Sequence, residues 1–252
     1  MTRPTTRDIQ CPLCRTTTEG RIVLPTPSTG PKTSDLRRYA DGPDPLPLVL
    51  CSCPSCGYVG KVSEFEEHAP LPGDLVAAEH TGAFFSQEAW DDAHDPMLAD
   101  RGPSRESTFG DEVGAHLTPR ADMGHADAAV RYEHLAQIER WRGGGPLREG
   151  DAFLRAAWLH SDKDDGGEDE RRCRTRALHC YRQAVTERRW FNRREDLCVI
   201  GYLIGELHRR LGDEGEAQRW YEQTVAWTSG MQHLQELVEL AERQAREPRD
   251  LV

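Results

Sequence analysis

Two pairs of cysteines have the spacing of metal-binding knuckles. The first is Cys11-Pro-Leu-Cys14 and the second is Cys53-Pro-Ser-Cys56. Two residues between cysteines let one turn present both thiolates to a single metal ion, and two such turns complete the tetrahedron that zinc favours. The sequence therefore predicts one structural zinc ion per chain, because four thiolate ligands leave no open coordination position for catalysis.

The residues around these pairs leave some questions open. Gly57 follows the second pair and permits the backbone conformation that directs amides at sulfur, whereas Arg15 stands at the equivalent place and is less suited to it. Cys51 could exchange with Cys53 as a ligand, although a knuckle needs two intervening residues, so we expect a spectator thiol. Redox-active cysteine pairs are the rival interpretation.

No other motif predicts catalysis. The sequence lacks a phosphate-binding loop, a nucleophile elbow and a His-Glu-x-x-His zinc motif. The acidic insertion 162–169 resembles a calcium loop without its closing acidic ligand, so we expect a solvated loop. We also expect loop histidines in solvent, without helical metal spacing, at His68, His80, His94, His116, His125 and His134. The protein is not expected to be an enzyme.

Composition narrows the class of protein. The 252 residues are 37% hydrophobic and 30% charged, with a net charge of −11. No apolar run approaches the roughly 20 residues of a membrane helix, and the N-terminus has no signal-peptide core. We expect a cytoplasmic protein with no membrane partner, and in that compartment eight cysteines favour metal binding over disulfides.

Three regions follow along the chain. Residues 8–67 predict a zinc-ribbon-like module with β-type runs at 22–24 and 48–50, and a long hairpin or loop between the knuckles. Residues 68–126 hold three basic and eleven acidic residues, and predict a mostly irregular linker with a short helix at 84–93. Residues 127–248 predict a helical domain. We expect the linker to keep the cores of the two ends separate.

The helical region has clear periodicity. A stripe of apolar residues, spaced three and four apart, runs from Leu197 to Leu211 and stops at Gly212. Asp213 and Glu216 resemble a capping box that starts the next helix. Similar stripes elsewhere give about six helices in this half of the chain.

An internal repeat suggests how these helices pair. The pattern Ala177-x-x-x-Tyr181 recurs as Ala217-x-x-x-Tyr221 at an offset of 40. Leu159-His160 matches Leu207-His208 at an offset of 48, which would place Ala177 against Ala157 and Ala217 against Gly205. Stacked helix pairs of tetratricopeptide type pack in this manner. An ordinary antiparallel bundle is the alternative.

The basic residues raise the question of nucleic acid. Two clusters lie in the helical region, at Arg171, Arg172, Arg174 and Arg176 and at Arg188, Arg189, Arg193 and Arg194. Most such runs are solvated faces paired with nearby acids, and no segment is a basic domain, so nucleic acid is disfavoured as a partner.

Several of these motifs together resemble a known family. They are the two cysteine pairs, with Gly57-Tyr58 after the second, and the segments Arg131–Gly143, Phe153–Trp158 and Tyr202–Asp213. Residues 11–60 and about 128–228 thus resemble the bacterial family called domain of unknown function 2225. The resemblance implies a four-cysteine metal-binding module joined to tetratricopeptide-like helices, and it implies no activity. The acidic segment 68–126 and the insertion 162–169 depart from the family pattern.

These features favour a non-enzymatic adaptor, in which a groove of the helical repeats binds a protein or peptide partner. A zinc-ribbon adaptor associated with nucleic acid is one alternative. A thiol-based sensor, in which oxidation expels the zinc, is another.

Overall fold

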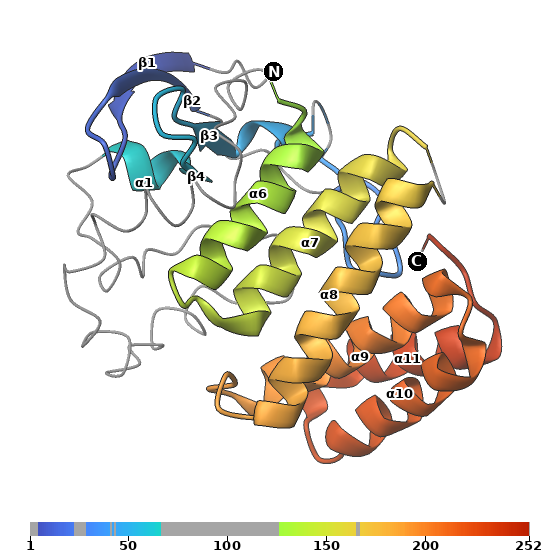
Figure 1. The fold of residues 1–252 in the computed structure, drawn as a ribbon. Helices are drawn as coiled ribbons and strands as arrows, with labels where there is room; N and C mark the ends of the chain where they lie inside the picture. The colour runs from blue at the N-terminus through green and yellow to red at the C-terminus, as the bar shows by residue number, and fades with distance from the viewer. Residues whose placement is uncertain are drawn as a thin grey trace.

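The computed structural model describes residues 5–22, 29–40, 42, 44–66, 126–164 and 167–251. Of the residues described, small β-hairpins form one end, and paired helices form most of the remainder (Figure 1). This arrangement confirms the predicted fold class of a small β module around four cysteines with packed helix pairs. The expected helix at 84–93 lies outside the described residues, as does nearly all of the expected linker.

Each cysteine pair closes its own two-stranded antiparallel hairpin. Strands β1 (Thr5–Gln10) and β2 (Thr17–Ile22) pair from Thr5 with Ile22 to Gln10 with Thr17. Strands β3 (Leu50–Ser52) and β4 (Val59–Lys61) form the second hairpin, and helix α1 (Val62–Glu66) follows it. The two knuckles are therefore turns, and each turn is held by the strands on its two sides.

The second β-run begins two residues later than the sequence predicts. Residues Leu46–Leu48 form a 3-10 turn, η1, and the strand begins only at Leu50. Pro45 and Pro47 explain the difference, because proline fixes φ near −65° and removes an amide donor that a strand would use. In the first run β2 ends at Ile22, and residues 23–24 lie outside the described part of the chain.

Six α-helices make up the C-terminal region, as the periodicity predicts. They pack in sequence order as antiparallel neighbours, and a 3-10 turn, η5 (Gln232–Leu234), precedes the last (Figure 1). In order they are α6 (Ala128–Trp141), α7 (Gly145–Ser161), α8 (Glu168–Glu187), α9 (Arg194–Leu211), α10 (Glu214–Trp227) and α11 (Gln235–Arg246). Among the described residues no helix is long and apolar enough to span a bilayer.

The predicted boundary between α9 and α10 is confirmed. Gly212 adopts a left-handed conformation with φ of 88°, which ends α9 at little steric cost. Asp213 then caps α10, because its carboxylate accepts a hydrogen bond from the amide of Glu216 at 3.2 Å.

The structure confirms the repeat between α8 and α10, the second helices of the two pairs. The predicted alignment of α7 with α9, the first helices, is wrong. A Cβ on Gly205 would lie 2.7 Å from the Tyr221 ring, and a Cβ on Gly150 would lie equally close to the Tyr181 ring. The equivalent of Gly205 is therefore Gly150 rather than Ala157. The first helices are offset by 55 residues instead of 48, because α8 has 20 residues where its counterpart α10 has 14, and because the segment 162–167 before α8 is longer than the segment 212–213 before α10.

The two ends of the chain share a hydrophobic core, which contradicts the expectation of separate cores. Buried residues of the hairpins, such as Val59 and Phe65, belong to the same cluster as Tyr132 and Ile138 of α6. The division into 8–67, 68–126 and 127–248 stays a prediction. Whatever the bounds, the cysteine module packs directly on α6.

Candidate metal centre

The first knuckle is held by backbone hydrogen bonds. The Cys11 amide donates to the Thr16 carbonyl at 2.9 Å, and the Arg15 amide donates to the Cys11 carbonyl at 3.1 Å. Arg15 adopts a left-handed φ of 61°. A side chain at this position carries a steric cost, but the fold imposes the conformation regardless.

The second knuckle repeats this geometry. The Cys53 amide donates to the Tyr58 carbonyl at 2.7 Å, and the Gly57 amide donates to the Cys53 carbonyl at 3.0 Å. Gly57 has a φ of 73°, close to that of Arg15. The two turns therefore have the same hydrogen-bond pattern and the same left-handed residue after the second cysteine.

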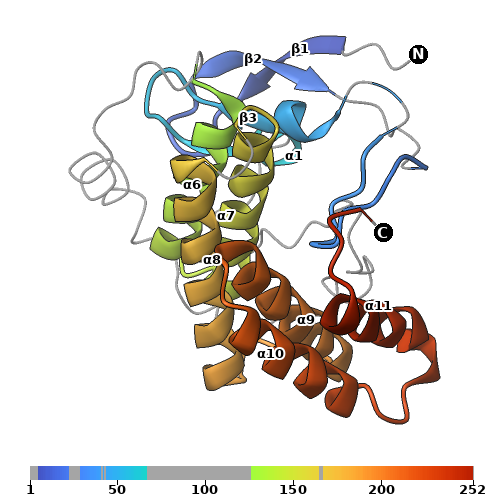
Figure 2. The same cartoon turned by 90° about the vertical axis from the view of Figure 1, so that its right-hand side faces the viewer.

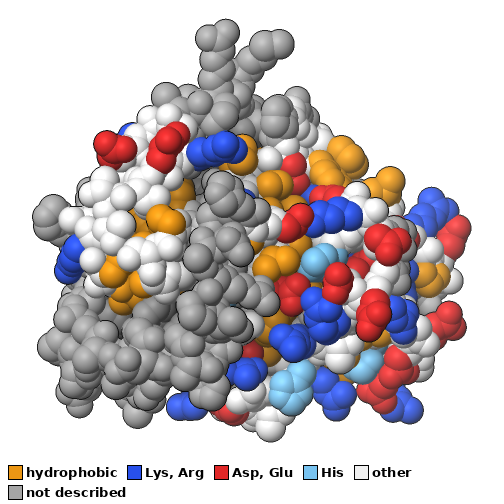
Figure 3. Space-filling model, turned by 45° about the horizontal axis from the view of Figure 1, so that its top comes forward, with side chains coloured by type: hydrophobic (Ala, Val, Ile, Leu, Met, Phe, Trp, Pro, Cys, Tyr) orange, Lys and Arg blue, Asp and Glu red, His pale blue; other side chains and the backbone are white. Residues whose placement is uncertain are grey.

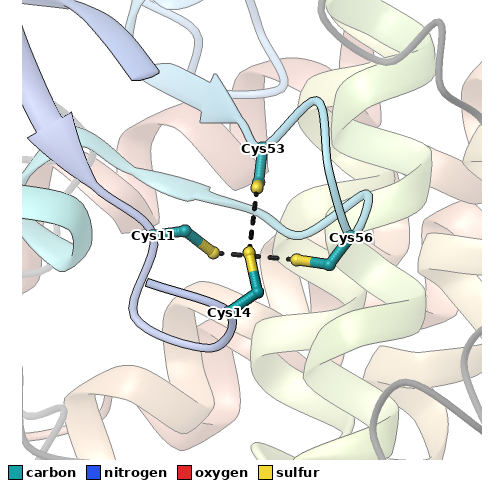
Figure 4. Close-up of side chains that lie close together, drawn as sticks. All are labelled: Cys11, Cys14, Cys53 and Cys56. Atoms are coloured by element: carbon teal, nitrogen blue, oxygen red, sulfur yellow. Dashed lines mark hydrogen bonds between the residues drawn. The ribbon is translucent and has the colours of Figure 1, made fainter. Parts of the chain in front are cut away.

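The two turns bring all four sulfur atoms together (Figure 4). Every pair of these sulfurs lies within 4.8 Å, with the Sγ atoms of Cys11 and Cys56 3.7 Å apart and those of Cys14 and Cys53 3.4 Å apart. A tetrahedral zinc with Zn–S bonds of about 2.3 Å places its sulfurs roughly 3.8 Å apart. The four-cysteine cluster thus has the donor set and size to hold a metal ion such as zinc.

The cluster is half enclosed by the protein. Cys11 and Cys53 are completely buried, Cys56 is half-buried and Cys14 is exposed. A hydrogen bond with Cys11 holds the pKa of Cys53 well below its usual range, while hydrogen bonds with neighbouring sulfurs raise the pKa values of Cys11 and Cys56. Neighbouring sulfurs therefore prevent all four thiols from ionising together. A divalent cation would allow all four to ionise.

Helix α6 contacts the backbone of the second knuckle and of the segment before it. A ring nitrogen of His134 lies 2.8 Å from the Gly57 carbonyl, and the Arg131 guanidinium donates to the Leu50 and Pro47 carbonyls at 2.8 and 2.9 Å. His134 is thus a buried helix residue, which corrects its expected place in a solvated loop. The other five histidines of that prediction lie outside the described residues. Sequence spacing could not link His134 to a turn 77 residues away.

The remaining cysteines lie outside this cluster. Cys51 is buried on strand β3, and its backbone pairs with Gly60. Cys173 lies within 4.8 Å of ligand atoms of Glu133 and His160. However, both Glu133 oxygens accept hydrogen bonds from Arg172 at 2.9 Å, so this second group of potential ligands is already an ion-pair network.

The chain between the knuckles forms an unexpected second feature. Residues 31–39 fold into a tight hairpin, here called the docked hairpin. The Thr33 amide donates to the Arg37 carbonyl at 2.8 Å, and Leu36 at the turn has a φ of 69°. The predicted loop or hairpin between the knuckles is therefore present. It lies far from the metal cluster, beside α9, α11 and the C-terminal tail (Figure 2).

The tip of the docked hairpin is buried against the helices. The Tyr202 hydroxyl of α9 donates to the Ser34 carbonyl at 2.7 Å, and the Ser34 amide donates to the Asp250 carbonyl at 2.9 Å. Ser34 and Asp35 are at most 1% exposed. The hairpin is thus bound through its backbone as well as its side chains, in the way that a peptide ligand is bound.

Buried Arg37 secures the docked hairpin through ion pairs with Asp162 and Asp44. The Arg37 guanidinium donates to Asp162 at 2.6 and 2.8 Å and to the Trp158 carbonyl at 2.9 Å. Asp162 begins the acidic insertion that the sequence suggests is only a solvated loop. Its role as the Arg37 partner could not be seen in the sequence, because the two residues are 125 positions apart.

Comparison with known proteins identifies the family. A model of the family described as uncharacterized proteins conserved in bacteria, DUF2225, matches residues 121–251, just over half of the chain. The chain belongs to the DUF2225 family. The DUF2225 match spans all six helices of the C-terminal region and contains neither the four cysteines nor the docked hairpin. No curated protein and no solved structure matches the chain significantly.

Proposed function

We propose that this chain is a non-enzymatic, zinc-binding interaction protein whose helical region binds a segment of a partner protein. One observation carries the proposal. Helix α9 and the tail after α11 already hold a polypeptide segment, the docked hairpin, through hydrogen bonds of Tyr202 and Asp250 to the Ser34 backbone. A helical surface that binds a turn of its own chain has the chemistry to bind a similar turn of another chain.

In this proposal Cys11, Cys14, Cys53 and Cys56 bind a single structural zinc ion. Four thiolate ligands exclude a bound water, so the ion has no position for a substrate. Its role is to join the two knuckles. Because the docked hairpin lies between Cys14 and Cys53 in the sequence, the metal closes a loop that carries the hairpin.

The placement of the arginines favours a protein partner over nucleic acid. Arg172 pairs with Glu133, and Arg174 pairs with Asp35 and Glu170, so these side chains are already neutralised. On the helical part of the face drawn in Figure 3, basic and acidic side chains are interspersed. Phosphate binding instead favours basic side chains gathered on one face.

The redox alternative also has a structural basis, because exposed Cys14 lies 3.4 Å from the sulfur of Cys53. A disulfide requires about 2.05 Å and could form only after the metal leaves. None of the eight cysteines, all of them in the described residues, forms a disulfide here.

Affinity capture from a bacterial lysate tests the proposal. The zinc-loaded full chain serves as bait beside two variants, Arg210→Glu and Arg219→Glu. Arg210 lies beneath the docked hairpin with a side chain 12% exposed, whereas the Arg219 side chain is 73% exposed. We expect proteins retained by the wild type and by Arg219→Glu to be lost with Arg210→Glu. Equal capture by all three baits, or capture of nothing specific, would reject a partner site on this surface.

A further inference from the structure

The docked hairpin is anchored by a single carboxylate at its tip. The Asp35 carboxylate accepts hydrogen bonds from Arg174 at 2.8 Å and from the Trp158 indole at 3.0 Å. Arg210 lies 3.6 Å from the same oxygen, and the Thr33 hydroxyl donates to the other oxygen at 2.6 Å. The helices therefore supply two cations and an indole donor that converge on one buried anion.

This anchoring site belongs to the helices, whereas the anion belongs to another part of the chain. Trp158, Arg174 and Arg210 come from α7, α8 and α9, and all three lie within the stretch that the family model matches. Asp35 lies outside that stretch. The helices supply these donors whether or not the hairpin is present, and any acidic side chain presented on a turn could accept their hydrogen bonds.

The contact is polar, which suits a contact that can open. The tip buries Ser34, Asp35 and Arg37, and Leu36 is the one buried apolar side chain of the docked hairpin. Buried ion pairs recover little more than the cost of desolvating their charges, so they add little net stability, while the fixed geometry of the donors selects a carboxylate. A hairpin bound in this way is held specifically, but more weakly than a segment packed into an apolar core.

Covalent attachment offsets this weakness. Both ends of the docked hairpin lead to the knuckles, so its effective concentration at the helices is on the order of millimolar, as for other short tethers. A free competitor must overcome that concentration. The same hairpin would bind much less completely if it were not tethered.

We propose that the docked hairpin is a built-in competitor, and that the partner inserts an acidic turn in its place, with its carboxylate between Trp158, Arg174 and Arg210. This inference rests on the proposed function and specifies its partner. The partner is a protein that presents a turn with an Asp or Glu at the tip. Binding is regulated because the internal hairpin must leave first.

A cyclic peptide can test the competition directly. The probe is residues 30–40 closed head to tail, since Gly30 packs against the backbone of Tyr39 and the ends of the segment are close together. A matched probe carries Asn in place of Asp35. Each peptide carries a fluorescent label and is titrated with the zinc-loaded full chain and with its Asp35→Asn variant. The variant retains the whole helical site, but its own docked hairpin is held more weakly.

We expect the Asp-containing peptide to bind Asp35→Asn at least tenfold more tightly than it binds the wild type. The Asn-containing peptide should bind the variant at least tenfold more weakly than the Asp-containing peptide does. Equal affinity of wild type and variant for the Asp-containing peptide, or no binding to a folded variant, overturns the proposal. If Asp35→Asn lacks its helical circular dichroism, Arg37→Gln replaces it, because Arg37 holds the docked hairpin through Asp162, whose side chain is 39% exposed, and leaves the Asp35 site intact.

The two proposals can fail separately. If the peptide assay fails but a partner is captured selectively from the lysate, the competition by the docked hairpin is rejected and the interaction function is kept. Peptide binding without any captured protein shows that the site accepts an acidic turn, but it rejects the interaction function and with it the partner. A partner captured more strongly by Asp35→Asn than by the wild type supports both.

Discussion

The contact between α9 and α10 depends on a glycine that leaves room for an aromatic ring. A Cβ on Gly205 would lie 2.7 Å from Cε1 and 2.8 Å from Cδ1 of Tyr221, far inside ordinary contact distance. The ring cannot retreat easily, because the Tyr221 hydroxyl donates to buried Glu206 at 2.6 Å and its face packs near Tyr202. Gly205→Ala should therefore strain the pair of helices.

The magnitude follows from two opposing effects. Overpacking by one methyl group costs about 1–3 kcal/mol, while replacing glycine by alanine within a helix gains up to about 1 kcal/mol. Gly215→Ala is the matched control, since it lies in α10 and a Cβ there meets nothing within 4 Å. The control should be unchanged or slightly more stable, so the two variants should differ by about 1–3 kcal/mol or more.

Thermal unfolding followed by circular dichroism measures this difference. For a chain of this size 1 kcal/mol corresponds to about 2–4 °C, so Gly205→Ala should unfold about 2–12 °C below Gly215→Ala. Equal midpoints for the two variants would refute a tight crossing at Gly205. The alignment of Gly150 with Gly205 would then lose its basis as well.

Two further predictions concern the contacts between the two ends of the chain. Removal of the metal by a strong chelator should lower the midpoint of helical unfolding by several degrees, because Arg131 and His134 of α6 lose ordered partners. An unchanged midpoint would mean that the helices are stable independently. Asp35→Asn should destabilise the chain at neutral pH, by up to about 3–5 kcal/mol if the docked hairpin stays in place. Although burial alone would raise the pKa of Asp35, Arg174 and Arg210 hold it below 3.8, so its stabilising effect is present above that pH and is lost as the pH falls below it. Denaturant unfolding at several pH values should show the wild type and Asp35→Asn converging in acid, and a constant difference would contradict the ion pair.

The sequence predicts the parts of this molecule that depend on local spacing. The cysteine pairs, the apolar stripe of α9 and the cap at Asp213 are all set by residues a few positions apart, so each appears in the structure where it was expected. Arg15 shows the limit of such rules. It takes the left-handed conformation that glycine prefers, because the backbone hydrogen bonds of the knuckle impose it.

The parts that could not be predicted depend on contacts between distant residues. Asp35 and Arg174 are 139 positions apart, and Gly57 and His134 are 77 apart. No period or motif in one sequence connects such pairs. The same limit explains the misplaced Ala157, because the pairing of α7 with α8 follows from the close approach of Gly150 to the Tyr181 ring, which the repeated letters do not show.

The central claim is that four cysteines from two turns bind one zinc ion, and metal content tests it most directly. Zinc is measured by elemental analysis in the purified wild type and in two single variants, Cys56→Ser and Cys51→Ser. We expect about one zinc per chain in the wild type and in Cys51→Ser, because the Cys51 thiol lies outside the four-sulfur cluster. Cys56→Ser should lose most of the metal. Equal loss in both variants, or a wild type that binds no zinc, would contradict the ligand assignment.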